Sequence, residues 1–413
     1  MILSSTLVAG ISLASMASAA PTIGGRALFG AGAASPSSSG TCTQSRLPIS
    51  VQVDTTAITM RKPAKQANLT GFLAKFWTTG STVNSQIIST TADGAAQKKR
   101  IEGTYNMWTQ TCVPNGKQGP LPLIIGIHGI NFDHSYWEFG YSKEYNFIEA
   151  ANQAGYAVLT YDRLGVGQSD KPDGIDVVQS STEVEILHQF IQQSRASGKY
   201  SKVLGIGHSY GSIQLTGIAA KYPADLDAVI LTGYAPSMAS VPLAFTGWAQ
   251  TLANQQPDVA TRARWSSLPS GSSVMSDQSY MGTGSSSADR FAFFAEGFYD
   301  EDAFQLAYNT KQTHTLGEFL TIAEPVSKPA TDYKGHTYVV TGEKDLIFCG
   351  GNCLQKATTV PGNSLLDDTK TLYPNAASFS TYVPPGAGHA LFTHHGTDKT
   401  ISQILAWCKN SGL

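Results

Sequence analysis

The stretch Gly207-His208-Ser209-Tyr210-Gly211 places a serine midway between two glycines. An apolar run over residues 203–206 precedes it and a helical pattern over 212–222 follows it, which predicts a strand, a sharp turn and a helix. A turn of this kind exposes the central hydroxyl and strains its backbone, so the flanking residues must be small. Ser209 is therefore the candidate nucleophile.

A neutral serine is a weak nucleophile and needs a base within hydrogen-bond reach. Among the nine histidines, His389 lies in a glycine-flanked loop directly after a predicted strand over 378–383, from which its side chain can turn back over the edge of the sheet. We predict that His389 is the base, with His394 and His395 as alternatives. His208 adjoins the serine, but neighbouring residues of a turn point in different directions, so we interpret it as a packing or oxyanion-region residue.

The base in turn needs a carboxylate that orients its ring. Asp345 follows the predicted strand over 336–340, at the carboxyl edge of the expected sheet, and Glu343 is the alternative two residues away. This prediction depends on position rather than on residue type, because most aspartates of any chain are solvated surface residues.

Serine attack on a carbonyl creates an oxyanion that needs backbone N–H donors. Tyr210, at the start of the helix after the serine, is expected to supply one. The loop after an apolar run over 121–127 begins His128-Gly129-Ile130, and the glycine allows the backbone to approach a substrate closely. We predict that the Ile130 N–H is the second donor, and we interpret His128 as a structural residue that fixes the loop by hydrogen bonds.

The chain from residue 121 onward alternates apolar strands with helices, which indicates a mostly parallel, twisted sheet covered by helices on both faces. The rhythm stops over residues 236–330, where aromatic residues gather in helical stretches. We interpret this segment as a mainly helical cap inserted into a core of residues 45–235 and 331–413, although the same aromatic residues could fill a local core. The predicted strands are 121–127, 156–161, 203–206, 228–231, 336–340 and 378–383, and the predicted helices are 142–153, 181–194, 212–222 and 397–410.

The N-terminal part divides into segments of different character. Residues 1–19 carry an apolar run followed by Ala-Ser-Ala, which predicts a secretory signal peptide; the run is too short and too rich in serine for a membrane anchor. Residues 20–44 are rich in Ser, Gly and Ala and are predicted to form a disordered arm. Two edge strands are expected at 47–53 and 100–109, separated by an irregular, partly helical insertion with an N-glycosylation acceptor at Asn68.

The chain has five cysteines, so at least one has no partner within it. Cys408 shares a helix face with apolar residues, the pattern of a buried position, and is the expected free thiol. That leaves Cys42 with Cys112 and Cys349 with Cys353 as the preferred pairs, although sequence alone does not determine connectivity. A zinc site at Cys349 and Cys353 is rejected because a second pair of ligands is missing.

Charge excludes several kinds of partner. Net charge is −2, charged residues make up 14% of the chain, well below the roughly 25% of average proteins, and no basic cluster is longer than Lys98-Lys99-Arg100. Nucleic acid and anionic membrane surfaces are therefore not expected as partners. We expect a small, apolar or weakly charged substrate.

Four motifs occur in a fixed order along the chain: His128-Gly129, Asp162 to Asp170 (Asp-Arg-Leu-Gly-Val-Gly-Gln-Ser-Asp), Gly207 to Gly211, and Asp345 followed by His389. On these motifs, the chain from residue 121 to the C-terminus resembles the α/β-hydrolase superfamily, in particular its secreted, capped, fungal-looking members. The resemblance implies that Arg163 is structural. The similar epoxide hydrolases and haloalkane dehalogenases use an aspartate nucleophile, whereas Ser209 favours attack on an acyl carbonyl.

We therefore predict an α/β-hydrolase fold and a secreted serine hydrolase that cleaves a carboxylic ester, lactone or thioester with no metal or organic cofactor. An acyltransferase and a proline-type aminopeptidase would use the same three residues and remain alternatives. The aminopeptidase would need an acidic anchor for the amine of its substrate. A non-catalytic binding protein of this fold is the alternative from another class.

Overall fold

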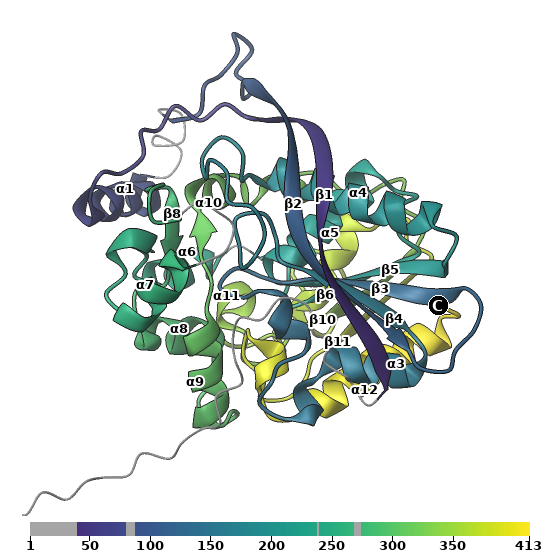
Figure 1. Ribbon diagram of the computed structural model, residues 1–413. Coiled ribbons are helices and arrows are strands. Elements are labelled where there is room, and N and C mark those ends of the chain that lie inside the picture. The colour runs from purple at the N-terminus through teal and green to yellow at the C-terminus, as the bar shows by residue number, and fades with distance from the viewer. Residues whose placement is uncertain (1–38, 80–86, 238, 268–273) are drawn as a thin grey trace, which may run out of the picture. The chain divides into compact units, whose positions relative to one another are not determined.

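The computed structural model describes residues 39–79, 87–237, 239–267 and 274–413. Within them, an eight-stranded sheet has the order β1-β2-β4-β3-β5-β6-β10-β11 (Figure 1). Neighbouring strands from β4 to β11 are parallel, whereas β2 is antiparallel to both β1 and β4. The sheet strands are β1 (Gly40–Thr56), β2 (Lys98–Pro114), β3 (Leu121–Ile127), β4 (Ala157–Tyr161), β5 (Tyr200–His208), β6 (Ala228–Thr232), β10 (His336–Val340) and β11 (Ser378–Tyr382).

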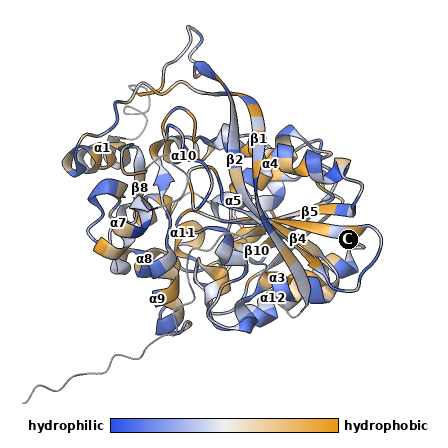
Figure 2. Cartoon of the chain, in the orientation of Figure 1, coloured by the Kyte–Doolittle hydropathy of each residue, from blue (hydrophilic) through white to orange (hydrophobic). Residues whose placement is uncertain are grey.

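The central strands are buried on both faces, as their apolar sequences predict. Every residue of β4 and β6 is buried, and Figure 2 shows hydrophobic residues concentrated along the central strands. Helices α4 and α5 cover one face of the sheet, and α3 and α12 lie over the other (Figure 1). These helices are α3 (Phe147–Ala154), α4 (Ser180–Ala196), α5 (Tyr210–Lys221) and α12 (Thr397–Asn410), with the short α11 (Leu346–Cys349) after β10.

The N-terminal strands differ from the prediction in two respects. β1 begins at Gly40, so residues 40–44 belong to a strand and not to the disordered arm; the signal peptide and the rest of that arm lie outside the described residues, except Ser39. Cys42 lies opposite Cys112 in the ladder and the two form a disulfide, as predicted, which ties this end of β1 to its partner. β1 is an edge strand, but β2 also pairs with β4 and is not, because residues 109–112 form a long-range ladder that no local pattern reveals.

The cap segment contains the predicted helices and, in addition, a three-stranded antiparallel sheet, β7-β8-β9. Its strands have two or three residues each, too few for a periodic signal. Among the described residues, no helix combines the length and apolar character needed to cross a bilayer. The cap elements are α6 (Val241–Gly247), β7 (Thr251–Leu252), α7 (Val259–Ser266), β8 (Tyr280–Gly282), α8 (Ser286–Phe293), α9 (Glu301–Thr310), β9 (His314–Thr315) and α10 (Leu316–Thr321).

Helix α1 (Gln66–Thr79), from the insertion between β1 and β2, packs against the cap. The Gln66 side chain donates to the Gln250 carbonyl at 2.9 Å and accepts the Leu252 N–H at 2.9 Å. The ring of Trp77 lies 5.9 Å from that of Phe245 in an edge-on contact. The N-terminal insertion therefore supports the cap rather than the sheet.

Candidate active site

The predicted site residues follow the carboxyl ends of parallel strands. In open α/β sheets this is the edge at which ligands bind. Ile130 follows β3, Ser209 follows β5, Asp345 follows β10 and His389 follows β11. The topology thus brings residues that are far apart in the chain to one edge.

Ser209 occupies the turn between β5 and α5 with φ 54° and ψ −114°, a strained conformation for a residue with a side chain. The two glycines permit this turn. A Cβ on Gly207 would lie 2.5 Å from the backbone of Gly211, and a Cβ on Gly211 would overlap the Ile127 carbonyl. The Ser209 N–H donates to the Thr232 carbonyl at the end of β6 at 2.8 Å, which anchors the turn to the neighbouring strand.

Asp345 and His389 meet in the interior. The Nδ1–H of His389 donates to Oδ2 of Asp345 at 2.6 Å, and neither side chain is exposed. The other carboxylate oxygen accepts the Phe348 N–H at 2.9 Å, which fixes the acid at the start of α11. The Cys349–Cys353 disulfide, also as predicted, closes the loop just beyond. In a neutral imidazole whose Nδ1 carries the proton, Nε2 is a hydrogen-bond acceptor.

The Nε2 atom of His389 is buried and bonds no other described group. A Cβ on Gly233, directly after β6, would lie 3.4 Å from the His389 ring, so the imidazole lies beside the strand end that anchors Ser209. No hydrogen bond joins the Ser209 hydroxyl to Nε2 within the described part of the chain.

The two alternative histidines bond elsewhere. His394 uses both ring nitrogens: Nδ1–H donates to the Ala390 carbonyl at 2.9 Å, and Nε2 accepts the Ala295 N–H of the cap at 3.0 Å. Burial lowers the pKa of His394 to about 4. His395 has 49% of its side chain exposed and contacts Asp300 at 3.1 Å. Neither ring bonds Asp345, so the geometry favours His389.

Glu343, the alternative acid, also has other partners. Its carboxylate accepts the Gly386 N–H at 3.0 Å and forms an ion pair with Lys344 at 2.8 Å. The hydrogen bond from Lys344 and that from Gly386 lower the pKa of Glu343. Glu343 therefore holds the loop that leads to His389, and the ring itself is bonded by Asp345.

The two predicted oxyanion donors, Ile130 and Tyr210, line a pocket together with Ser209. Tyr210 is the first residue of α5, so its N–H has no acceptor within its own helix. The Ile130 N–H bonds no other described group. Both amides are therefore available beside Ser209.

Two buried histidines near the serine have the structural roles expected of them. The Nδ1–H of His128 donates to the Gly129 carbonyl at 2.9 Å, and its Nε2 accepts the Arg163 N–H at 3.0 Å. Burial lowers the pKa of His128 and of His208 well below the usual value. The His208 ring stacks on Tyr136 with centroids 4.3 Å apart.

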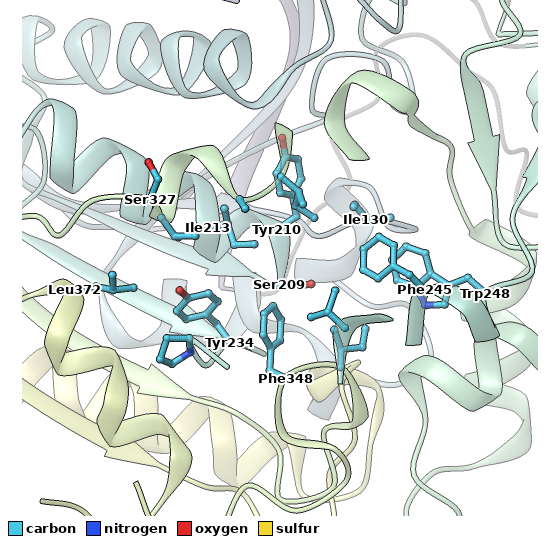
Figure 3. A pocket seen from close by; sticks show the side chains of 16 residues that line it. Ile130, Ser209, Tyr210, Ile213, Tyr234, Phe245, Trp248, Ser327, Phe348 and Leu372 are labelled. Atoms are coloured by element: carbon cyan, nitrogen blue, oxygen red, sulfur yellow. The ribbon is translucent and has the colours of Figure 1, made fainter. Parts of the chain in front are cut away.

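A cavity of about 400 Å³ lies at Ser209. In Figure 3, Ser209 lies near the middle of the view, with Phe245 and Trp248 of the cap on one side and Tyr234 and Leu372 on the other. None of the 16 lining residues carries a charge, and apart from Ser209 and one further serine all are apolar or aromatic. The pocket therefore extends past Ser209 in two directions through apolar surroundings.

Residues 124–401, more than half of the chain, match the sequence model of the alpha/beta hydrolase family. The chain belongs to this family. Lipase 1 of Psychrobacter immobilis is 35% identical over 118 residues, which cover 28% of this chain and 32% of that protein. The AB hydrolase superfamily protein YfhM of Bacillus subtilis (strain 168) is 32% identical over 109 residues, 26% of this chain and 34% of that protein. The chain thus spans about a third of the length of each of these curated relatives.

The solved structures that the chain matches are more distant. The crystal structure of the monoacylglycerol lipase of Paleococcus ferrophilus is 15% identical to this chain, with a TM-score of 0.47, and the match covers 74% of this chain and 99% of that chain.

Arg163 is the centre of a buried ion-pair group that the sequence did not predict. Its Nη1 lies 2.6 Å from Glu183 of α4 and 2.5 Å from Glu318 of α10. Its guanidinium lies 4.7 Å from the ring centroid of Tyr210, a cation–π contact. Burial raises the pKa of Glu183 to about 8, against the opposing charge of Arg163. Arg163 thus joins the sheet, the cap and the serine turn, in keeping with a structural role.

Asp162 organises the same motif loop. Its carboxylate accepts Nδ1–H of His134 at 2.6 Å and the Gln168 N–H at 2.7 Å. Burial lowers the pKa of His134, but the charge and hydrogen bond of Asp162 outweigh it and raise the pKa to about 9. Asp133 completes a group of three possible metal ligands within 4.8 Å. Because metal ligation requires a neutral imidazole, we interpret this group as an ion pair that fixes the loop.

Proposed function

We propose that this hydrolase cleaves a carboxylic ester, or the related lactone or thioester, through an acyl-enzyme on Ser209. The observation that supports this most directly is the buried hydrogen bond between Asp345 and His389. It leaves Nε2 of His389 unpartnered at the sheet edge that carries Ser209. Serine, acid and histidine follow one another in the chain in the order used by α/β-hydrolases. A serine nucleophile favours attack on an acyl carbonyl.

In the proposed reaction, Nε2 of His389 takes the hydroxyl proton of Ser209 as Oγ bonds to the carbonyl carbon. The carbonyl oxygen becomes an oxyanion that accepts hydrogen bonds from the Ile130 and Tyr210 amides. The C–O bond to the leaving alcohol then breaks, and the imidazolium, stabilised by Asp345, returns the proton to that alcohol. Water repeats the sequence on the acyl-enzyme, which releases the acid and restores the hydroxyl.

The pocket supports an uncharged substrate with apolar groups on both sides of the reacting carbonyl. A charged group buried against this lining would lose its hydration without gaining a partner. No acidic side chain is among the lining residues, which disfavours a proline-type aminopeptidase because that activity needs an anchor for the substrate amine. We propose a small, neutral ester as the substrate and no cofactor in the reaction.

The proposal is tested first with a fluorophosphonate probe, which bonds covalently to an activated serine. We expect the probe on Ser209 in the wild type and no label in Ser209→Ala. A folded wild type that takes up no label would favour the non-catalytic binding protein. Assays with neutral esters of graded chain length, a charged ester and an amino-acid anilide then test the substrate class, and added alcohols separate hydrolysis from acyl transfer.

We further propose that the protein is secreted, with residues 1–19 removed. Two disulfides are compatible with an oxidising compartment. Asn68 is exposed on α1, where a glycan could be attached. N-terminal sequencing of protein from the medium should find a chain that begins near residue 20, and retention of the uncleaved chain inside the cell would contradict the proposal.

A further inference from the structure

Asn131 adopts a backbone conformation that most side chains avoid. Its φ is 75°, in the left-handed region, where glycine is common and asparagine is tolerated. It directly follows Ile130, whose N–H is the proposed second oxyanion donor. Only 3% of Asn131 is exposed, so its side chain is enclosed by the protein rather than presented at a surface turn.

The Asn131 side chain is held entirely by the cap. Its Nδ2–H donates to Oδ2 of Asp289 in α8 at 3.2 Å, and its Oδ1 accepts the hydroxyl of Thr283, directly after β8, at 3.3 Å. Lys311, directly after α9, donates to the carbonyl and hydroxyl oxygens of Thr283 at 2.9 and 3.2 Å. Because an ammonium group only donates, the Thr283 hydroxyl accepts from Lys311 and keeps its own hydrogen for a bond such as that to Asn131. Both ends of the Asn131 amide are thus specified.

The backbone of the same loop is held by the next cap residue. The Gln312 N–H donates to the Asn131 carbonyl at 3.0 Å, and its side-chain amide donates to Asp133 at 2.7 Å. Thr283, Asp289 and Lys311 are at most 2% exposed. Buried polar groups are costly unless they bond one another, so these contacts hold the loop in one position against the cap.

We propose that Asn131 is the positioning residue through which the cap aligns the Ile130 N–H of the oxyanion hole. This inference rests on the proposed function. If left-handed backbone were the only requirement, glycine would meet it at lower cost. Asparagine also meets this requirement, and it adds an amide whose nitrogen and oxygen can both form hydrogen bonds with the cap. The cap then completes the oxyanion hole in addition to lining the pocket.

The consequence concerns the transition state. The oxyanion exists only after attack, so a misaligned donor lowers kcat and leaves KM nearly unchanged. Loss of one such donor lowers kcat by about 100- to 1,000-fold in a well-studied serine protease. Displacement of the Ile130 amide without its removal should cost less, about 10- to 100-fold.

The test compares Asn131→Gly with the wild type on a neutral aryl ester. Glycine keeps the left-handed backbone and removes only the side chain, so we expect the loss of kcat with unchanged KM. The thermal midpoint should fall, because Thr283 and Asp289 lose a buried partner, so the rates are measured well below that midpoint. Asn115→Gly, in the exposed turn after β2, is the matched control and should retain full kcat. Full kcat in Asn131→Gly would overturn the inference, and a raised KM with unchanged kcat would assign Asn131 to substrate binding instead.

Asp289 tests the same contact from the cap. Asp289→Asn keeps an oxygen acceptor for Asn131 and should retain most of kcat, whereas Asp289→Ala should lose about as much as Asn131→Gly. The double variant Asn131→Gly with Asp289→Ala should be no worse than either single variant, and additive losses would contradict a shared contact. If Asn131→Gly does not fold, the Asp289 pair decides the question. A wild type that binds no fluorophosphonate and cleaves no ester would instead overturn the proposed function.

Discussion

The carboxyl edge of the sheet and the cap use the same kinds of residue for different purposes. His389 and His394 are five residues apart in one region of the chain, and both are buried. His389 bonds Asp345 through one nitrogen and keeps the other unpartnered. His394 uses both nitrogens, one for the Ala390 carbonyl of its own loop and one for the Ala295 N–H of the cap. A buried polar side chain with an unpaired hydrogen-bonding atom is suited to catalysis, whereas one whose hydrogen-bonding atoms are all paired stabilises the fold.

The largest loss of activity is expected from a substitution at Ser209, the proposed nucleophile. Ser209→Ala removes the attacking oxygen, which the oxyanion hole cannot replace, so turnover of an aryl ester should fall by about 10⁴-fold or more. The free energy of unfolding should be preserved, because alanine keeps the Cβ of Ser209 and the loss of the hydroxyl from the turn costs little. Steady-state rates together with a thermal melt check both statements. Retained turnover would move the nucleophile away from this turn.

The next largest loss of kcat is expected from a substitution of the proposed acid, Asp345. Asp345→Asn keeps the shape of the side chain but no longer stabilises the imidazolium, so kcat should fall by about 10³- to 10⁴-fold. Glu343→Gln, two residues away, is the matched control and should keep most of the activity, because Glu343 bonds Gly386 and Lys344. A larger loss in Glu343→Gln than in Asp345→Asn would reverse the assignment.

The edge of the sheet could be predicted from sequence because its signals are local. Apolar runs that alternate with helical patterns predict a parallel sheet. Because parallel strands end at the same edge, the residues that follow them are then predicted to lie along that edge. The glycines around Ser209 reflect a steric requirement of the turn itself. Cysteine parity and the apolar helix face of Cys408 left two preferred disulfides, and both are present, with Cys408 free and buried.

The cap could not be predicted to the same depth because its contacts are long-range. Glu183 lies on a helix and Glu318 in the cap, and nothing in their neighbourhoods indicates that both bond Arg163. Asn131 reads as an ordinary loop residue until Asp289, 158 positions later, is placed against it. Strands of two or three residues likewise exist only because the cap brings them together.

A stability measurement sharpens the contrast between the two histidines that were alternatives to His389. His394→Ala removes a buried ring and leaves the Ala295 N–H without its acceptor, so the free energy of unfolding should fall by about 3 kcal/mol. His395→Ala, at an exposed position, should cause no measurable change. Urea unfolding of the two variants checks this, and equal midpoints would show that the bond from His394 to the cap is unimportant.

The smallest effects separate two histidines by the sign of their pH dependence. His394 has a folded pKa of about 4, below the unfolded value of about 6.5, so its contribution to stability is complete above pH 6.5 and is lost as pH falls toward 4. His134, paired with Asp162, has a folded pKa of about 9, so its contribution is complete below pH 6.5 and is lost as pH rises through 9.

Replacing each histidine with a residue that does not titrate isolates its contribution to the acidic or the alkaline limb of the curve of stability against pH. In His134→Asn the alkaline decline of the free energy of unfolding should flatten between pH 6.5 and 9, by at most about 3 kcal/mol. In His394→Gln the acidic decline between pH 6.5 and 4 should flatten, and the alkaline limb should not change. Urea midpoints measured from pH 4 to 10 distinguish the two. If His134→Asn altered only the acidic limb, the charged pair with Asp162 would be refuted, because a raised folded pKa contributes stability only where the imidazole is protonated.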